Sequence, residues 1–192
     1  QWHCLILDEA QNIKNPRAKS SEAARALTAG VPGVNHVLPF CNHGPQAGAT
    51  LAHPHLQILA SPLIPALVRE KARRLAAHRR EHGSCLLCDT VAAEEEKKVR
   101  VIAGNDQWLL VAPWASSFPY EMRAIPRRHA GRFEDAGDEE LALLAPLLKS
   151  ALASLEQIHQ NPSYNVIIHG GTSAGDGSPG APEAAGPDFH WH

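Results

Sequence analysis

The stretch TLAHPHLQILASP, residues 50–62, decides the fold class. Polar side chains recur in it at a spacing of two, at His53, His55 and Gln57. In an extended strand every second side chain points to the same face of the sheet. The pattern therefore predicts a strand over residues 49–60, with the polar groups on one face and Leu56 and Ile58 directed into a core.

The rest of the chain alternates between short apolar runs and two helical patterns. We expect one helix over residues 65–81, opened by Pro65 and stopped at Gly83, and another from Asp138 to about residue 159, kinked or split at Pro146. Further strands are predicted at residues 4–7, 34–40, 99–103, 108–112, 121–125 and 164–169. Residues 170–188, rich in Gly, Pro, Ala and Ser, predict a loop. These elements predict an α+β fold, an antiparallel sheet with flanking helices.

A weak internal echo suggests a duplicated unit. His53-Pro54-His55 is matched near the end of the chain by His190-Trp191-His192. Both copies have the form H-x-H, and both are expected on strands.

Composition and charge restrict the classes of partner. The 192 residues include 44% hydrophobic and 20% charged residues and carry a net charge of −2. A balance this close to neutrality gives no overall field for nucleic acid or a membrane surface. No apolar run approaches the ~20 residues of a spanning helix, and no signal peptide is recognisable. A basic helix face at residues 69–80 is interpreted as solvated rather than as a phosphate or nucleic-acid surface. We expect a soluble, cytoplasmic protein.

Cys85-Leu86-Leu87-Cys88 has the spacing of a metal knuckle. Two intervening residues allow both sulfur atoms to reach one ion at ~2.3 Å. A structural zinc needs four ligands, and His129 and His190 are the candidates for the other two. The alternative is a redox pair or two small core residues, but no thioredoxin-like strand and helix surround the motif.

The His53 and His55 pair has three interpretations: ordinary core or surface histidines, a two-histidine metal site, or nucleophilic catalysis by imidazole. Neutral imidazole attacks phosphorus well and also leaves well, so a phosphoryl-histidine can turn over. The neighbouring Gln57 can donate to phosphoryl oxygens. The upstream stretch supplies glycines and small polar groups that let a phosphate approach backbone amides, at Asn42, Gly44, Gly48 and Thr50. Together these features favour catalysis.

These residues carry a resemblance to a known family. FCNHGPQAGATLAHPHLQILASPLIP resembles the active-site segment of galactose-1-phosphate uridylyltransferases, in the histidine-triad superfamily, where the last histidine of the triad is a glutamine. The similarity continues through Cys85-x-x-Cys88-Asp89, residues 111–129 and Tyr164-Asn165, and ends at His190-Trp191-His192. It covers about residues 34–192, and implies the end of a first repeat and most of a second.

The resemblance implies a ping-pong transfer between a UDP-sugar and a sugar 1-phosphate. His55 would attack the α-phosphorus and carry the uridylyl group. Gln57 and Thr50 would contact the transferred group, and Asn42 and Gly44 would shape its pocket. His53 would be a zinc ligand of the first repeat, and the second repeat's zinc ligands would be Cys85, Cys88, His129 and His190. Relatives of this kind are commonly homodimers.

Two alternatives accompany this interpretation: a relative that uses an adenylyl sugar, and an inactive zinc-stabilised fragment. The ligands expected to complete a zinc site at His53 lie in the early part of the first repeat, which is absent here, and the second H-x-H forms the last three residues of the sequence.

Residues 1–30 resemble a different family. WHCLILDEAQNIKNPRAKSSEAARAL is similar to the Asp-Glu-Ala-Gln box of Swi/Snf-type helicase-like ATPases, in which Asp8 and Glu9 would handle magnesium and water. No phosphate-binding loop accompanies the box. We therefore divide the chain into an appendage at 1–32, an ATPase-like fragment or an unrelated strand and helix, and a uridylyltransferase-like region at 33–192. A true fusion and a misassembled reading frame are both consistent with this arrangement.

Overall fold

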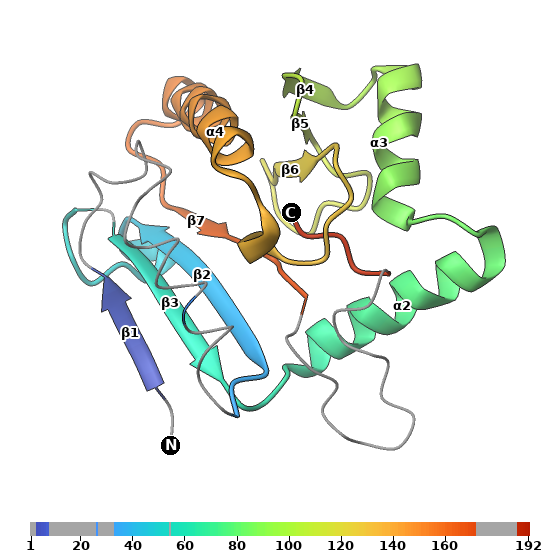
Figure 1. Cartoon of the computed structure of the whole chain (residues 1–192). Helices are drawn as coiled ribbons and strands as arrows, with labels where there is room; N and C mark the ends of the chain where they lie inside the picture. The colour runs from blue at the N-terminus through green and yellow to red at the C-terminus, as the bar shows by residue number, and fades with distance from the viewer. Residues whose placement is uncertain (1–2, 8–25, 27–32, 54, 172–187) are drawn as a thin grey trace.

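The structure, a computed structural model, describes residues 3–7, 26, 33–53, 55–171 and 188–192. Helices and antiparallel strands are mixed along the chain (Figure 1), which confirms the predicted α+β class. Most of the predicted appendage at 1–32 lies outside the described residues, which include only 3–7 and 26 of it. The same is true of the acidic pair Asp8 and Glu9 and of most of the loop 170–188.

Two antiparallel sheets organise the described residues. The larger has the strand order β1-β3-β2-β7, and its strands are β1 (His3–Leu7), β2 (His36–His43), β3 (His55–Ser61) and β7 (Tyr164–Ile167). The smaller has the order β4-β5-β6, and its strands are β4 (Val101–Gly104), β5 (Trp108–Val111) and β6 (Arg123–Pro126). β7 therefore brings a late part of the chain beside β2, as Figure 1 shows.

The three long helices are α2 (Ala66–His82), α3 (Leu86–Lys97) and α4 (Asp138–Ile158). Short 3-10 turns are η2 (Pro45–Ala47) and η3 (Phe133–Asp135). The N-terminal Pro65 and the left-handed Gly83, with φ of 74°, bound α2 as predicted. α4 continues through Pro146 as one helix, so the predicted split is wrong.

The small sheet is buried on both faces, which explains why all four residues of β5 are buried. On one face Trp108 and Leu110 pack with Leu147 and Ala151 of α4. On the other face Leu109 packs in a second cluster with residues of α3. Full burial of one large apolar side chain stabilises the folded state by about 1.5–3 kcal/mol.

Two predicted strands need correction. β3 begins at His55, so the predicted strand over residues 49–60 is wrong for its first part, and His53 precedes the strand. Pro54 has no backbone N–H to donate to a strand ladder, which opposes a longer strand. Residues 188–192 form no strand, although His192 and His169 exchange two backbone hydrogen bonds.

One described helix, α4, has the length and the apolar composition of a membrane-spanning segment. It has 21 residues, and an 18-residue window within it has a mean hydropathy of 1.3. Leu147 and Ala151 of α4 pack against the small sheet.

Candidate active site and metal centre

His55 is the first residue of β3, and its ring orientation is set locally. Its Nδ1 lies 3.2 Å from the carbonyl oxygen of His53. A carbonyl only accepts, so Nδ1 carries the proton and Nε2 keeps its lone pair. The residue is 3% exposed, and the ring of the exposed His53 lies 6.1 Å from its ring. The lone pair required of a nucleophile is thus assigned to one atom.

The other predicted phosphate contacts gather around the same end of the large sheet. Asn42 is the strand partner of His55. Gln57 follows His55 by two residues on β3, which places both on one face of the strand. Thr50 is exposed and lies in the irregular segment that leads to β3.

The loop after Asn42 depends on glycine at two positions. Gly44 and Gly48 have φ of 80° and 81°, a region that other residues rarely adopt. The amides of Ala47 and Ala49 both donate to the carbonyl of Gly44 at 3.2 Å, which curls the loop. A Cβ at Gly44 would also collide with the side chain of Ser163, so this position excludes any larger residue.

Residues before and on β7 contact this loop, and only the structure reveals it. Asn165 lies opposite Asn42 and hydrogen-bonds its side chain at 2.7 Å. The ring of Tyr164 stacks on His43. In the sequence Tyr164-Asn165 is recognisable only as part of a family motif, with no role attached to either side chain.

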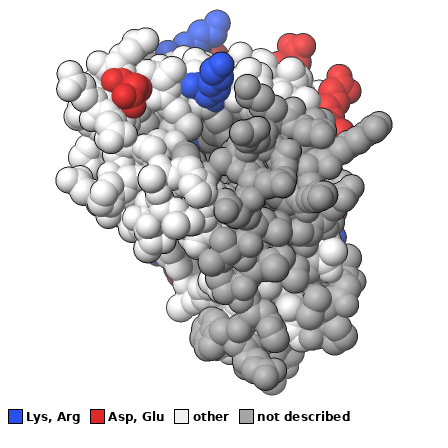
Figure 2. All heavy atoms as spheres, turned by 90° about the vertical axis from the view of Figure 1, so that its left-hand side faces the viewer, with Lys and Arg blue, Asp and Glu red and all other residues white. Residues whose placement is uncertain are grey.

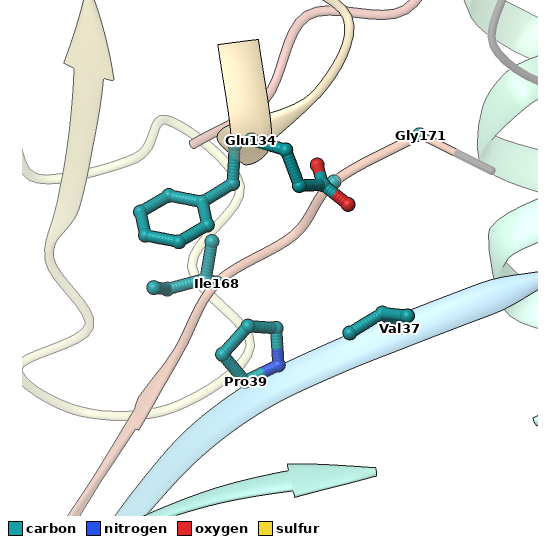
Figure 3. A pocket seen from close by; sticks show the side chains of 7 residues that line it. Val37, Pro39, Glu134, Ile168 and Gly171 are labelled. Carbon is teal, nitrogen blue, oxygen red and sulfur yellow. The ribbon is translucent and has the colours of Figure 1, made fainter. Parts of the chain in front are cut away.

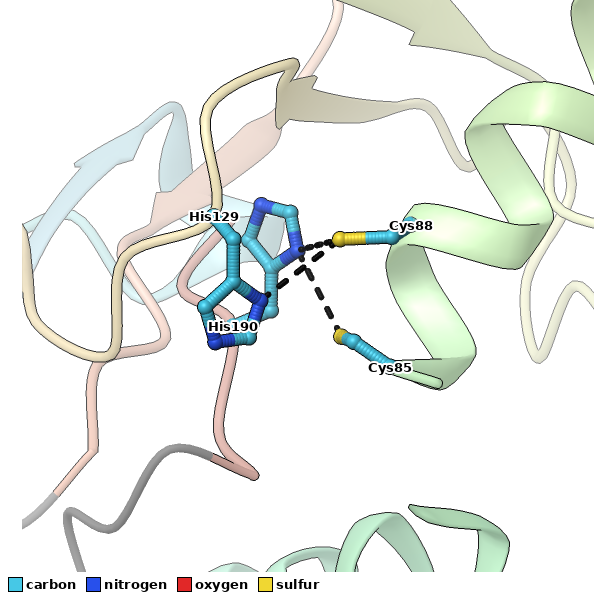
Figure 4. Close-up of side chains that lie close together, drawn as sticks. All are labelled: Cys85, Cys88, His129 and His190. Atoms are coloured by element: carbon cyan, nitrogen blue, oxygen red, sulfur yellow. Dashed lines mark hydrogen bonds between the residues drawn. The ribbon is translucent and has the colours of Figure 1, made fainter. Parts of the chain in front are cut away.

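Four predicted metal ligands meet in one cluster, shown in Figure 4. Cys85 precedes α3, Cys88 lies in its first turn, His129 follows β6 and His190 comes from the C-terminal segment. Their ligand atoms all lie within 4.8 Å of one another. The cluster is therefore able to hold a metal ion.

The donor set and its spacing fit a tetrahedral ion. Nδ1 of His190 lies 3.7 Å from Cys85 Sγ and 3.5 Å from Cys88 Sγ, and Nδ1 of His129 lies 3.5 Å from Cys88 Sγ. Sulfur and nitrogen ligands of one tetrahedral zinc stand about 3.6 Å apart, given the usual bond lengths. His190 Nε2 donates to the carbonyl of Pro126 at 2.9 Å, so its Nδ1 is left to face the cluster.

The electrostatics of the cluster also favour a cation. Burial, and next the neighbouring Cys85, raise the pKa of Cys88 to about 11. Burial, and next the nearby His129, lower the pKa of His190 to about 4. A neutral imidazole is ready to bind a metal, and a bound cation would offset the cost of forming buried thiolates.

His53 does not belong to this cluster, and among the described residues it joins no other group of metal ligands. Its role as a first-repeat zinc ligand stays a prediction.

A small, shallow hollow lies between β2, η3 and the chain after β7 (Figure 3). It is lined by Val37, Pro39, Phe133, Glu134, Ile168, Gly170 and Gly171, none of which is a predicted site residue. Figure 2 shows a face on which most visible charges stand along the upper rim and carry both signs. Among the described residues visible on that face, the charges do not gather into a patch of one sign.

Comparison with known proteins assigns the family. Residues 71–192 match the model of the galactose-1-phosphate uridyl transferase C-terminal domain. The chain is 32% identical over 136 residues to the ADP-glucose phosphorylase of Arabidopsis thaliana, covering 71% of this chain and 37% of that protein. It is 30% identical over 125 residues to the galactose-1-phosphate uridylyltransferase of Thermotoga maritima, covering 65% and 39%.

Solved structures give the same result. A structure described as uridylyltransferase superposes with a TM-score of 0.77 at 31% identity, over 90% of this chain and 51% of that one. The ADP-glucose phosphorylase of Arabidopsis thaliana with bound ADP-glucose gives 0.73 at 27% identity, over 89% and 53%. The chain thus spans about half the length of these structures and less than half of the curated relatives. It belongs to the galactose-1-phosphate uridyl transferase family and contains the family's C-terminal domain.

Proposed function

We propose that the protein is a nucleotidyltransferase that exchanges a nucleoside monophosphate between a UDP-sugar and a sugar 1-phosphate, through a covalent intermediate on His55. The observation that carries the proposal is the contact between His55 Nδ1 and the His53 carbonyl at 3.2 Å. It gives the ring one tautomer, with the nucleophilic lone pair on Nε2.

In the first half-reaction His55 Nε2 attacks the α-phosphorus and forms an N–P bond. The bond from that phosphorus to the bridging oxygen breaks, and the sugar 1-phosphate leaves with the electron pair. The proton on Nδ1 stays hydrogen-bonded to the His53 carbonyl, which stabilises the positive charge on the ring. In the second half-reaction a phosphate oxygen of another sugar 1-phosphate attacks the same phosphorus and His55 leaves.

Neighbouring groups then have defined tasks. Gln57 and Thr50 contact the transferred phosphoryl group as donors. Asn42 and Gly44 shape the loop that receives it. Access matters because His55 is 3% exposed, so the groups that cover the ring have to move for the nucleotide to reach Nε2.

The metal is proposed to be zinc, held by Cys85, Cys88, His129 and His190. Four protein ligands leave no open position, which is typical of a structural ion rather than a catalytic one. It would fasten α3, the chain after β6 and the C-terminal segment to one another. His53 is proposed as a ligand of a separate first-repeat site.

A second candidate is transfer of an adenylyl group, as in an ADP-glucose phosphorylase. The 32% identity to the Arabidopsis thaliana protein of that name favours it. An inactive, zinc-stabilised fragment is the remaining candidate. We further propose a cytoplasmic location, a homodimer, no membrane or nucleic-acid partner, and the division at residue 32 between an ATPase-like appendage and the transferase region.

The test is transfer of label from UDP-glucose or ADP-glucose carrying radioactive α-phosphorus. Wild-type protein should acquire an acid-labile, base-stable label. His55→Ala should abolish it, and His53→Ala with zinc supplied should keep it. His82→Ala, on the exposed end of α2, is the matched control and should label normally. No label from either nucleotide sugar would leave the inactive fragment as the correct candidate.

A further inference from the structure

Asn165 hydrogen-bonds both Asn42 and the loop that follows Asn42. It lies on β7, directly opposite Asn42 of β2. Its Nδ2 donates to Oδ1 of Asn42 at 2.7 Å and to the carbonyl oxygen of Ala47 at 3.0 Å. One side-chain amide therefore connects a strand of the second half of the chain to Asn42 and to the loop that follows it.

The two hydrogen bonds determine the direction of the Asn42 amide. A backbone carbonyl only accepts, so the Asn165 atom beside Ala47 has to be the nitrogen. The same nitrogen meets Asn42, which must therefore present its oxygen. Nδ2 of Asn42 is left on the other side of the amide, 4.0 Å from the place where a Cβ on Gly48 would stand. Within the described part of the chain, this nitrogen has no hydrogen-bond partner.

Asn42 lies beside His55, so a nucleotide that reacts at His55 could accept a hydrogen bond from Asn42 Nδ2. Asn42 has Asn165 as its partner on β7 and His55 as its partner on β3. The glycine at position 48 leaves the space above Asn42 Nδ2 without a side chain. A phosphate or ribose oxygen of a nucleotide that reacts at His55 is an acceptor that fits there.

We propose that Asn165 is a positioning residue for nucleotidyl transfer: it holds the Asn42 amide so that Nδ2 donates to an oxygen of the nucleotide. The inference rests on the proposed function. The second half of the chain would thus fix a donor on β2, in the first half, through a hydrogen bond between the partner residues Asn42 and Asn165.

Two substitutions at Asn165 separate orientation from simple packing. In Asn165→Ala, Asn42 is free to turn either way, and we expect the affinity for the nucleotide sugar and kcat/KM to fall about tenfold, as for a lost hydrogen bond to a charged group. Asn165→Asp has the same shape but only accepts, so Asn42 turns its nitrogen toward it and points oxygen at the nucleotide. We expect a larger loss, about 100-fold.

The experiment measures the dissociation constants of UDP-glucose and ADP-glucose, the labelling rate of His55, the zinc content and the melting temperature. Wild type, Asn42→Ala, Asn165→Ala and the double variant form a cycle. If the inference is right, the double variant is no worse than Asn42→Ala, and Asn165→Asp is worse than Asn165→Ala at unchanged zinc content and melting temperature. Asn161→Gly is the control, because Asn161 contacts the adjacent His43 at 3.3 Å and has a φ of 50° that glycine accepts.

The outcomes distinguish the two proposals. If the Asn165 variants bind the nucleotide sugars and label His55 as well as wild type does, the positioning role is overturned and the proposed function is not. Additive losses in the double variant do the same, because they show that Asn165 acts independently of Asn42. A wild-type chain that neither binds nor is labelled by the two nucleotide sugars overturns the proposed function, and the positioning role with it.

Discussion

His55 and His192 are each oriented by a hydrogen bond of the same type. The Nδ1 atom of each ring faces the carbonyl oxygen of the histidine two residues earlier, at 3.2 Å for His55 and 3.3 Å for His192. The two H-x-H segments are thus alike in local geometry as well as in sequence. They differ at the other ring nitrogen, because Nε2 of His192 lies 2.9 Å from Nζ of Lys71.

This difference between the Nε2 atoms of His55 and His192 predicts which of the two histidines becomes attached to the nucleotide. His192 Nε2 accepts a hydrogen bond from Lys71, so its lone pair is occupied. We expect all acid-labile label from an α-phosphorus-labelled nucleotide sugar on the peptide that contains His55. Proteolysis under basic conditions followed by mass spectrometry checks this, and label on the peptide containing His192 would contradict it.

The cysteine and histidine cluster predicts the metal content. Cys88→Ser should lose about one equivalent of zinc and lower the melting temperature by several degrees, because the ion links three separate segments. Cys41→Ser is the matched control, since Cys41 is also a free cysteine but lies outside the cluster. Elemental analysis of the two purified variants decides the matter, and equal zinc content in both would rule out the four-ligand site.

His169 predicts a loss of stability in mild acid. Burial, and next the charge of Lys71, lower its pKa from 6.5 to about 4. As the pH falls from 6.5 toward 4, the unfolded chain takes up a proton that the folded chain refuses, so folding becomes less favourable. His169→Asn removes this contribution. The unfolding free energy of wild type should fall between pH 7 and pH 5. That of His169→Asn should fall less, by up to about 2 kcal/mol.

Urea unfolding of both proteins at the two pH values measures that difference. Identical decreases in the two proteins would show that His169 does not carry the acid sensitivity.

Gly44 predicts a defect confined to the active-site loop. Gly44→Ala combines a left-handed φ of 80° with a collision against Ser163, so the loop that follows Asn42 has to move. We expect labelling of His55 to slow by about tenfold or more, a loss typical of a misplaced contact. Gly33→Ala has a similar φ of 86° with nothing within 4 Å, so it isolates the backbone strain. If the two variants label His55 equally slowly, the collision with Ser163 is unimportant.

Local patterns predicted much of the secondary structure. Pro65 and Gly83 gave the limits of α2 to within one residue, and the apolar runs at 99–103 and 108–112 gave the two strands β4 and β5. α3 was missed because its first turn contains the Cys85-x-x-Cys88 motif, which indicates metal binding and carries little helical periodicity. The strand at His55 was predicted too long, since alternation of side chains does not reveal where a proline ends the ladder.

The sequence by itself determined the fold class, the family and the identity of the chemical groups, because side-chain periodicity, turn residues and ligand types are local properties of the chain. Only the tertiary structure decided which groups meet. His129 and His190 reach Cys88 across 41 and 102 residues, and Asn165 reaches Asn42 across 123. Such contacts depend on strand pairing and on how helices pack against a sheet, and no spacing within the sequence specifies those distances.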